Sequence, residues 1–535
     1  MLRQTIQLQS ILASNVISDK FSFNPVSARR IYPRDFILSN HRKSFSMNPS
    51  STPLLWQRWT QYLTYAMHGL ILFIFFSATW WWRPRWAYAK WVPDFFRERL
   101  SYPSNTQEYL SVYYIRFTLV YLVAILACLW VLTMFKGLRE LVLDGRIWWA
   151  AGLVLLSLYI RLSVGWADQK GIANSQAIQW MLVTIFALIV TCNGPQPRWV
   201  ATALVGGTIF HAAIAITQSA LQHEVNLGWL DQHWLKIGLD LVEYRRSPDA
   251  SGVPVVQADG VRFLRAYGLT SHPNPLAGGL AVGIIAGLWM WLKPEMRRTA
   301  AWVTTIGVWG LLLTFSRSGI GSLAVGLIVT IGLFFINRNL KGDGWRGIVA
   351  LAIMLALVVG VFYIGYRPLI ESRAGDGEEG LPSVEDISIA AREILTEQAR
   401  EIFRDHRWTG IGIGNFPWES QKLIDQDPRN LDMQGTNVHN IYHLILAELG
   451  IVGVAFTSWV FIFAVGLLWI QWREGKLSPE AACLWGAVGA WLAVGWYDYY
   501  HWVIFTHQII FWGVMAAALT PSNRRSGDIE ADETD

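Results

Sequence analysis

Residues 300–336 read AAWVTTIGVWGLLLTFSRSGIGSLAVGLIVTIGLFFI, and Arg317 is the only charged residue among them. A helix of about 20 apolar residues is long enough to cross the roughly 30 Å hydrocarbon core of a bilayer. The pattern predicts two membrane helices, near 300–315 and 319–336, with Ser316, Arg317 and Ser318 at a tight turn between them. Membrane helices are therefore expected to build the fold.

Apolar runs of similar length recur along the whole chain. The chain is 53% hydrophobic and only 16% charged, whereas a soluble domain carries about 25% charged residues. A soluble enzyme and a disordered scaffold are both disfavoured by these values. The sequence predicts an all-α polytopic membrane protein with about 12 transmembrane helices, near 61–82, 114–135, 147–165, 177–193, 197–217, 275–292, 300–315, 319–336, 346–366, 450–472, 481–497 and 501–520.

The net charge of +5 comes from the start of the chain. The first 46 residues hold seven Lys and Arg against two Asp, and the remaining residues balance at 37 against 37. The basic pI is therefore no sign of nucleic acid as a partner. Residues 1–60 are predicted to be a basic tail that is disordered or, in part, precedes a true start at Met47. Residues 521–535 are predicted to be a disordered cytoplasmic tail.

Lysine and arginine in the short connections predict the orientation of the spans. They gather in the second, sixth, eighth and tenth connections and in the tail, which share one side if the N-terminus is cytoplasmic. The first connection disagrees and is expected to lie partly along the interface. The resulting division is helices 1–5 at 61–217, an outer loop at 218–272, helices 6–9 at 273–366, a large helical outer loop at 367–449, and helices 10–12 at 450–520.

The second outer loop is predicted to contain a helix from about Ser383 to Arg404. Apolar residues recur there at helical spacing, and charged residues cover the other faces. Ser383 followed by Asp386 suits a capping box at the start of this helix. Long ordered loops are usually functional, so the loop is expected to do more than join two spans.

A first polar pattern runs from Arg265 to Asn274, at the start of the sixth span. Pro273 and Pro275 suit the first turn of a helix, whose free backbone amides would face outward. Helix N-termini and arginines both favour anions. The alternative is an interfacial Arg265 that reaches lipid headgroups.

A second pattern places Arg317 between two apolar helices. The small residues around it, Ser316, Ser318 and Gly319, would let a tight reversal aim the guanidinium into a cavity. The alternative is a lone arginine that caps a helix C-terminus.

A third pattern joins three alternating glycines at 410, 412 and 414 to His439, Asn440 and His443. The third glycine comes one position too early for a dinucleotide loop, and no βαβ context surrounds it. The two histidines are four apart, as in zinc sites, but no third ligand is evident and no metal is expected. His439 beside Asn440, at the mouth of a span, is better suited to general base chemistry near neutral pH. An interfacial histidine satisfied by backbone is the alternative.

The three patterns together are stronger evidence for a functional site than each pattern alone. The orientation rests on loop charge alone, yet it places Arg265, Arg317 and His439 all on the outer side. Two arginines and a histidine suit chemistry on a diphosphate whose lipid stays in the bilayer.

These segments resemble the O-antigen ligase and O-antigen polymerase superfamily of bacterial membrane proteins. The resemblance rests on R-x-x-G…H-P-N from Arg265 to Asn274 and on T-F-S-R-S-G at 314–319. It continues with R…G-x-G-x-x-x-F from Arg392 to Phe416 and with H-N-x-Y…E-x-G-x-x-G at 439–453. Order and spacing agree from about residue 200 to 520, whereas the first four spans match only in being hydrophobic.

The resemblance implies a fold related to GT-C type lipid-linked glycosyltransferases, a site facing outward from the bacterial inner membrane, and no cofactor or metal. A glycan would pass from undecaprenyl diphosphate to a glycan, glycolipid or protein acceptor. By the family's pattern, Arg265 and Arg317 would hold the diphosphate, Arg392 would add positive charge, and His439 would take the proton of the acceptor hydroxyl. Further candidates from the same motifs are His272, Asn274, Asn440 and Tyr442.

The sequence does not determine which acceptor is used. An O-antigen ligase, which uses a lipid A–core sugar, is the first choice, and an O-antigen or exopolysaccharide polymerase is the alternative. A transporter or flippase of lipid-linked oligosaccharide could use the same arginines. No internal repeat of the kind common in transporters is evident in the sequence.

Overall fold

The computed structural model describes residues 54–77, 82–84, 117–133, 135–223, 225, 239–241, 253–258, 260–270, 272–337, 340, 342–372, 384–428, 433 and 435–520. Two compact units are distinguished, Met1–Gln57 and Arg58–Asp535. Most of the predicted N-terminal tail, the first connection, Ser383 and the tail 521–535 lie outside the described residues. The residues of the candidate site all belong to the second unit.

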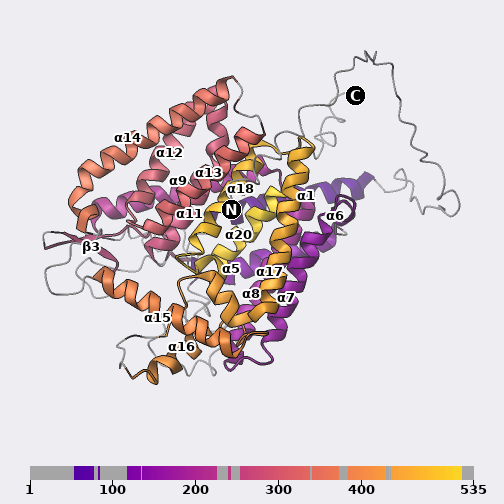
Figure 1. The fold of residues 1–535 in the computed structure, drawn as a ribbon. Coiled ribbons are helices and arrows are strands. Elements are labelled where there is room, and N and C mark those ends of the chain that lie inside the picture. The colour runs from indigo at the N-terminus through magenta and orange to yellow at the C-terminus, as the bar shows by residue number, and fades with distance from the viewer. Residues whose placement is uncertain are drawn as a thin grey trace, which may run out of the picture. The chain divides into compact units, whose positions relative to one another are not determined.

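The described residues are mostly helical (Figure 1). The α-helices are α1 (Leu54–Ser77), α5 (Phe117–Leu132), α6 (Leu138–Leu143), α7 (Ile147–Ser163), α8 (Lys170–Asn193), α9 (Pro197–Leu221), α11 (Pro273–Ala286), α12 (Arg297–Leu312), α13 (Arg317–Ile336), α14 (Asp343–Ser372), α15 (Val384–Asp405), α16 (Phe416–Asp425), α17 (Ile441–Arg473), α18 (Pro479–Val494), α19 (Tyr500–Val503) and α20 (Phe505–Ala518). Two 3-10 turns, η3 (Leu288–Leu292) and η4 (Pro294–Met296), follow α11.

Each of the twelve predicted apolar stretches overlaps a helix of the described residues. Among the described residues, six helical segments are long and apolar enough to cross a membrane: Lys170–Asn193, Pro197–Leu221, Pro273–Leu292, Arg317–Ile336, Asp343–Ser372 and Ile441–Arg473. Four shorter apolar helices lie at Leu122–Leu132, Ile147–Ser163, Pro479–Val494 and Phe505–Ala518. The chain thus has the helices of a polytopic membrane protein, and the number of twelve spans stays a prediction.

Several helices extend beyond the predicted spans, and two of them, α14 and α17, are broken at a predicted span boundary. α14 continues past Tyr366, whose backbone is not helical (φ −118°, ψ 18°). Pro368 follows closely, and proline disrupts the helix turn before it. α17 begins before its predicted span and is broken at Gly450, with a φ of 63°. The apolar pattern therefore located the spans, and the two breaks separate them from their helical extensions.

Strands were missing from the all-helical prediction. β1 (Trp82–Pro84) pairs antiparallel with β2 (Leu239–Leu241), and β3 (Val255–Ala258) pairs antiparallel with β4 (Val261–Leu264). The β3–β4 hairpin ends directly before Arg265, whose backbone N–H donates to the carbonyl of Pro254 at 3.2 Å. The hairpin thereby positions the first candidate arginine.

Polar contacts join the connections that were predicted to share the cytoplasmic side. Lys293, after η3, lies 3.9 Å from the carboxylate of Glu480, at the start of α18. The amide of Asn337, at the end of α13, donates to the carbonyl of Leu477 at 2.6 Å. These residues belong to the sixth, eighth and tenth connections, which therefore meet at one end of the helices.

The connections predicted to lie outside are joined in the same way. The side chain of Asn415 accepts a 2.7 Å hydrogen bond from the backbone of Gln169, between α7 and α8. Lys422 of α16 contacts Asp168 at 2.6 Å. The backbone N–H of Ile441 donates to the carbonyl of Gly495 at 2.8 Å. The alternation of sides that was inferred from loop charge agrees with these contacts.

Small residues let α11 pack closely against its neighbours α9, α12, α13 and α18. A Cβ on Gly283 would lie 1.6 Å from the hydroxyl of Thr208 and 3.0 Å from the carbonyl of Leu204, both on α9. A Cβ on Gly319 of α13 would lie 2.3 Å from Ala277 of α11. Such small-residue contacts are the usual means of close helix packing in membranes. They fix α11, whose N-terminus carries two candidate site residues.

Gly283→Ala is expected to lower the thermal unfolding temperature of the detergent-solubilised protein. The added methyl group must displace Thr208 and the backbone of α9, and overpacking of this kind costs about 1–3 kcal/mol. Gly332→Ala is the matched control, because a Cβ on this glycine of α13 meets nothing within 4 Å. Equal unfolding temperatures for the two variants would contradict the close α9–α11 contact.

Candidate active site

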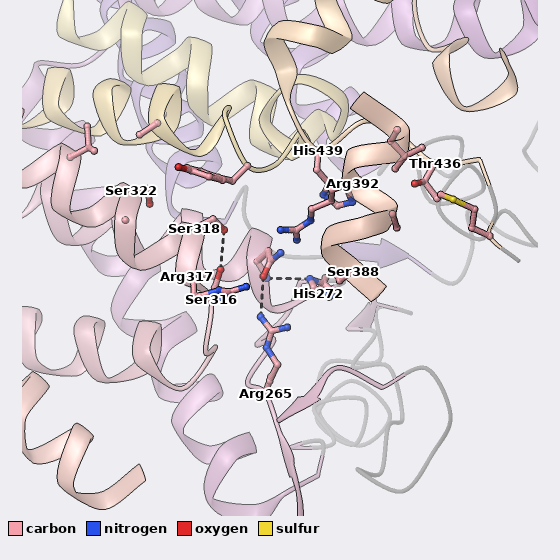
Figure 2. Close-up of a pocket in the computed structure, with 18 residues that line it drawn as sticks. Arg265, His272, Ser316, Arg317, Ser318, Ser322, Ser388, Arg392, Thr436 and His439 are labelled. Carbon is pink, nitrogen blue, oxygen red and sulfur yellow. Dashed lines mark hydrogen bonds between the residues drawn. The ribbon is translucent and has the colours of Figure 1, made fainter. Parts of the chain in front are cut away.

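A cavity of about 1230 Å³ opens among α13, α15 and the loops that precede α11 and α17 (Figure 2). The turn after α18 completes its wall. Its lining residues are Arg265, His272, Asn274, Ser316, Arg317, Ser318, Gly321, Ser322, Val325, Ser388, Ala391, Arg392, Leu395, Met433, Thr436, His439, Ala493 and Tyr497.

The cavity brings together most of the predicted site. Six of the eight candidates line it, and only Asn440 and Tyr442 do not. Three of the six are arginines, and no aspartate or glutamate of the described chain lines the cavity with them. Such a charge distribution favours an anion. The elements that carry these residues lie far apart in sequence, so the convergence is a property of the fold.

Arg265 is buried, with 7% of its surface exposed. Its Nε donates to the carbonyl of Thr314 at 2.8 Å, and its Nη2 donates to the side-chain oxygen of Asn274 at 3.0 Å. The backbone of the next residue, Ala266, donates to the carbonyl of Leu313 at 3.0 Å. The alternative of an interfacial arginine that reaches headgroups therefore does not hold for Arg265.

Two buried side chains of α9 fix the loop that follows Arg265. The amide of Gln218 accepts from the backbone N–H of Gly268 at 2.8 Å and donates to its carbonyl at 2.9 Å. The imidazole of His211 accepts from the backbone of Leu269 at 2.7 Å. Gly268 has a φ of 57°, and a Cβ there would lie 2.7 Å from His211. Both the backbone conformation and the lack of space for a side chain therefore require glycine at this position. Sequence reasoning missed Gln218 and His211.

The predicted helix start after Arg265 is confirmed. α11 begins at Pro273, and His272 is the N-cap, whose Nδ1 accepts from the backbone N–H of Asn274 at 3.3 Å. Proline at the first helical position has no orphan amide to satisfy. His272 and Asn274 therefore enter the cavity from the first turn of α11.

Arg317 is the first residue of α13, so the alternative of a cap on a helix C-terminus does not describe it. Phe315 makes the reversal before it, with a φ of 49°. The hydroxyl of Ser316 caps α13 by accepting from the backbone N–H of Gly319 at 3.3 Å, and it lies 3.2 Å from the hydroxyl of Ser318. The guanidinium of Arg317 and the positive end of the α13 dipole therefore lie at the same place, and both favour an anion there.

Arg392 reaches the cavity from α15, the helix predicted within the outer loop. Its Nε is buried and has no hydrogen-bond acceptor among the described residues. Buried residues of α15, Leu395 and Ala399, belong to the same hydrophobic core as α17. A buried cationic donor without a partner on the wall of a cavity suits an anionic ligand.

His439 faces a carboxylate that sequence reasoning did not assign to the site. Nδ1 of His439 lies 3.7 Å from Oδ1 of Asp498, which is longer than a hydrogen bond and becomes an ion pair when the ring is protonated. Burial raises the pKa of Asp498, but the facing His439 and the backbone N–H of Tyr499 outweigh burial, so its pKa lies below the usual range. The ring of Tyr499 packs edge-on against the imidazole at 5.2 Å.

Asn274 connects this pair to Arg265. Its Nδ2 donates to Oδ2 of Asp498 at 3.1 Å, while its Oδ1 accepts from Arg265. Polar contacts thus run from Arg265 through Asn274 and Asp498 to His439. A signal for Asp498 was present in the sequence, because it is the only acidic residue between Glu480 and Asp528. Lone carboxylates in apolar segments are functional candidates.

Asn440 and Tyr442 support the site from outside the cavity. Asn440 is the N-cap of α17, and its side chain accepts from the backbone N–H groups of Tyr442 at 3.0 Å and His443 at 3.1 Å. The hydroxyl of Tyr442 donates to the carbonyl of Leu492 at 2.7 Å. Since His439 precedes the helix, it does not share a helical face with His443, and the zinc-like spacing does not describe their arrangement.

The glycine alternation forms a packing loop. Gly410, Gly412 and Gly414 all have positive φ, from 65° to 93°. The backbone N–H of Gly412 donates to the carbonyl of Glu448 at 2.9 Å, and the side chain of Glu448 accepts from the backbone of Phe416 at 3.3 Å. The backbone N–H groups of this loop bond within the protein, that of Gly412 to α17, that of Gly410 to the carbonyl of His406 at 2.9 Å and that of Ile413 to the hydroxyl of Ser163 at 3.2 Å.

Comparison with known protein families finds a match for the central part of the chain. The family described as O-antigen ligase matches residues 302–458, from α12 into α17. This range includes Arg317, Arg392 and His439, whereas Arg265 and Asp498 lie on either side of it. No curated protein matches the chain. The predicted resemblance is confirmed over residues 302–458, which match the O-antigen ligase family and make up less than a third of the chain.

Proposed function

We propose that the protein transfers a glycan from undecaprenyl diphosphate to an acceptor hydroxyl on the outer face of the bacterial inner membrane. A lipid A–core sugar is the proposed acceptor. The observation that carries the proposal is the cavity itself, where three arginines meet a histidine backed by Asp498. The O-antigen ligase domain gives independent support.

The diphosphate of the donor fits the cationic part of the cavity. Arg265, Arg317 and Arg392 would bind its oxygens, and the N-terminus of α13 adds backbone donors at the same place. Arginine suits this role because its planar fork binds two phosphate oxygens at once. The charge that develops on the departing diphosphate would be offset by groups already in position.

The polyprenyl chain fits the face of α13 that continues from Arg317. Gly321 and Val325 follow at helical spacing and line the same cavity. Ile320 and Ile328 of this helix are exposed, as expected for side chains that meet lipid. The lipid would thus stay in the bilayer while its diphosphate reaches the arginines.

His439 would act as the general base. With Nδ1 facing Asp498, the other ring nitrogen, Nε2, is left to accept the proton of the acceptor hydroxyl. The acceptor oxygen then bonds to the anomeric carbon as the bond from that carbon to the diphosphate oxygen breaks, and the electron pair leaves with the diphosphate. Asp498 would stabilise the imidazolium that forms and hold the ring in place, as the carboxylate does in catalytic triads. One in-line attack inverts the anomeric carbon.

His439→Ala is expected to lower the rate of glycan transfer by about 10²–10⁴-fold, and Asp498→Asn by a comparable factor, because both remove general base catalysis. The measurement uses purified protein in detergent, a labelled carrier-linked glycan and several acceptors. The increase in the mass of each acceptor is followed. Gain on a lipid A–core glycolipid is expected. Full activity of His439→Ala would sink the assignment of the base. Transfer to a second carrier-linked repeat would indicate a polymerase, and no transfer at all would favour a flippase.

Arg317→Ala and Arg392→Ala are expected to lower kcat/KM for the donor by about 10²–10³-fold, the usual effect of losing one donor to a developing anion. Lysine at either position should restore part of the activity, since it keeps the charge. Arg404→Ala is the matched control, because Arg404 is an exposed arginine of α15 that does not line the cavity. Equal effects of Arg392→Ala and Arg404→Ala would show that charge on α15 acts only at long range.

A further inference from the structure

Two exposed aromatic side chains occupy the turn between α18 and α19. Trp496 is 59% exposed and Tyr497 is 62% exposed. Tyr497 lines the cavity together with His439, and Asp498 follows it directly. The proposed function assigns no role to either ring. Exposed aromatic groups beside a site often mark a binding surface.

Several hydrogen bonds fasten this turn to the start of α17. The carbonyl of Gly495 accepts from the backbone N–H of Ile441 at 2.8 Å, and the carbonyl of Trp496 accepts from the side chain of Asn440 at 3.3 Å. The ring of Trp496 packs on Tyr442 with 4.7 Å between centroids. The backbone of the turn and the ring of Trp496 are therefore fastened to the residues that directly follow His439.

The turn is also closed within itself. The backbone N–H of Tyr497 donates to the carbonyl of Val494 at 2.8 Å, and that of Trp496 donates to Ala493 at 3.2 Å. Rigid aromatic side chains give a large contact area at a low cost in conformational entropy. A preformed surface of this kind suits a flat ligand that is partly apolar and partly polar.

Pyranose rings have this character, because their C–H faces are apolar and their hydroxyls lie at the edge. The cationic residues of the cavity come from the loop before α11 and from α13 and α15, whereas Trp496 and Tyr497 come from a different element. Anchoring at the membrane interface would also explain exposed aromatics. It does not explain why Tyr497 forms part of the cavity wall beside the base.

We propose that the ring of Tyr497, with Trp496 beside it in the turn, stacks on the acceptor sugar. The reacting hydroxyl of the sugar then faces His439. This inference rests on the proposed function and adds the subsite that binds the acceptor. The aromatic pair and the arginines would then hold the acceptor sugar and the donor diphosphate separately, with the base at their junction.

The test measures KM for a lipid A–core glycolipid at saturating undecaprenyl-diphosphate glycan, and KM for the donor at saturating acceptor. Tyr497→Ala is expected to raise the acceptor KM about ten-fold, which corresponds to about 1.4 kcal/mol of lost stacking. The donor KM should stay within about two-fold by the same reasoning. Tyr497→Phe should keep the acceptor KM, since stacking needs the ring and not the hydroxyl.

Tyr62→Ala is the matched control, because Tyr62 of α1 is equally exposed at 64% and does not line the cavity. Tyr497→Leu provides a second variant that keeps apolar bulk, and it should raise the acceptor KM as Tyr497→Ala does. Thermal unfolding checks that each variant is folded.

An unchanged acceptor KM in folded Tyr497→Ala would overturn the subsite and leave the proposed function standing. An equal rise in both KM values, or the same rise in Tyr62→Ala, would also overturn it, since the rings would then serve structure or membrane anchoring. Absence of transfer by the unaltered protein would overturn the proposed function together with the subsite.

Discussion

The side-chain amide of Asn274 lies between the positive charge of Arg265 and the negative charge of Asp498. An asparagine offers an acceptor at one end and donors at the other. Asn274 uses the first for Arg265 and the second for Asp498, so a buried cation and a buried anion each bond to a different end of the same group. Direct pairing of the two would neutralise both. With Asn274 between them, Asp498 can face His439 and Arg265 can contribute positive charge to the cavity.

This amide has to stand where three distant segments meet, and the packing of α11 places it there. Asn274 lies in the first turn of α11, Arg265 follows the β3–β4 hairpin, and Asp498 follows α18. α11 packs directly on α9, α13 and α18. The glycine contacts at 283 and 319 hold these helices close together, and the loops at the end that carries the site share hydrogen bonds. Close helix packing is thus a condition of the site as well as of stability.

Much of this arrangement could be predicted from the sequence. Apolar length located the helices, loop charge grouped their ends, and the motifs supplied Arg265, Arg317, Arg392 and His439. The pairing of Asp498 with His439 could not be predicted, because spacing says nothing about which of many distant loops returns to a histidine. Two features of the local backbone could not be predicted from the sequence either. Phe315 adopts a positive φ that its residue type disfavours, and the β3–β4 strands are too short to show a pattern.

The shortage of carboxylates on the cavity wall has a consequence for turnover. On the proposed function, the transferred glycan departs and the carrier diphosphate remains, with a newly exposed terminal phosphate that carries additional negative charge. Arg265, Arg317 and Arg392 would hold this product at least as firmly as they held the donor, and Asp498 does not line the cavity to repel it. The carrier would then leave more slowly than it arrived, and the return of undecaprenyl diphosphate to the membrane pool would set the pace of each cycle.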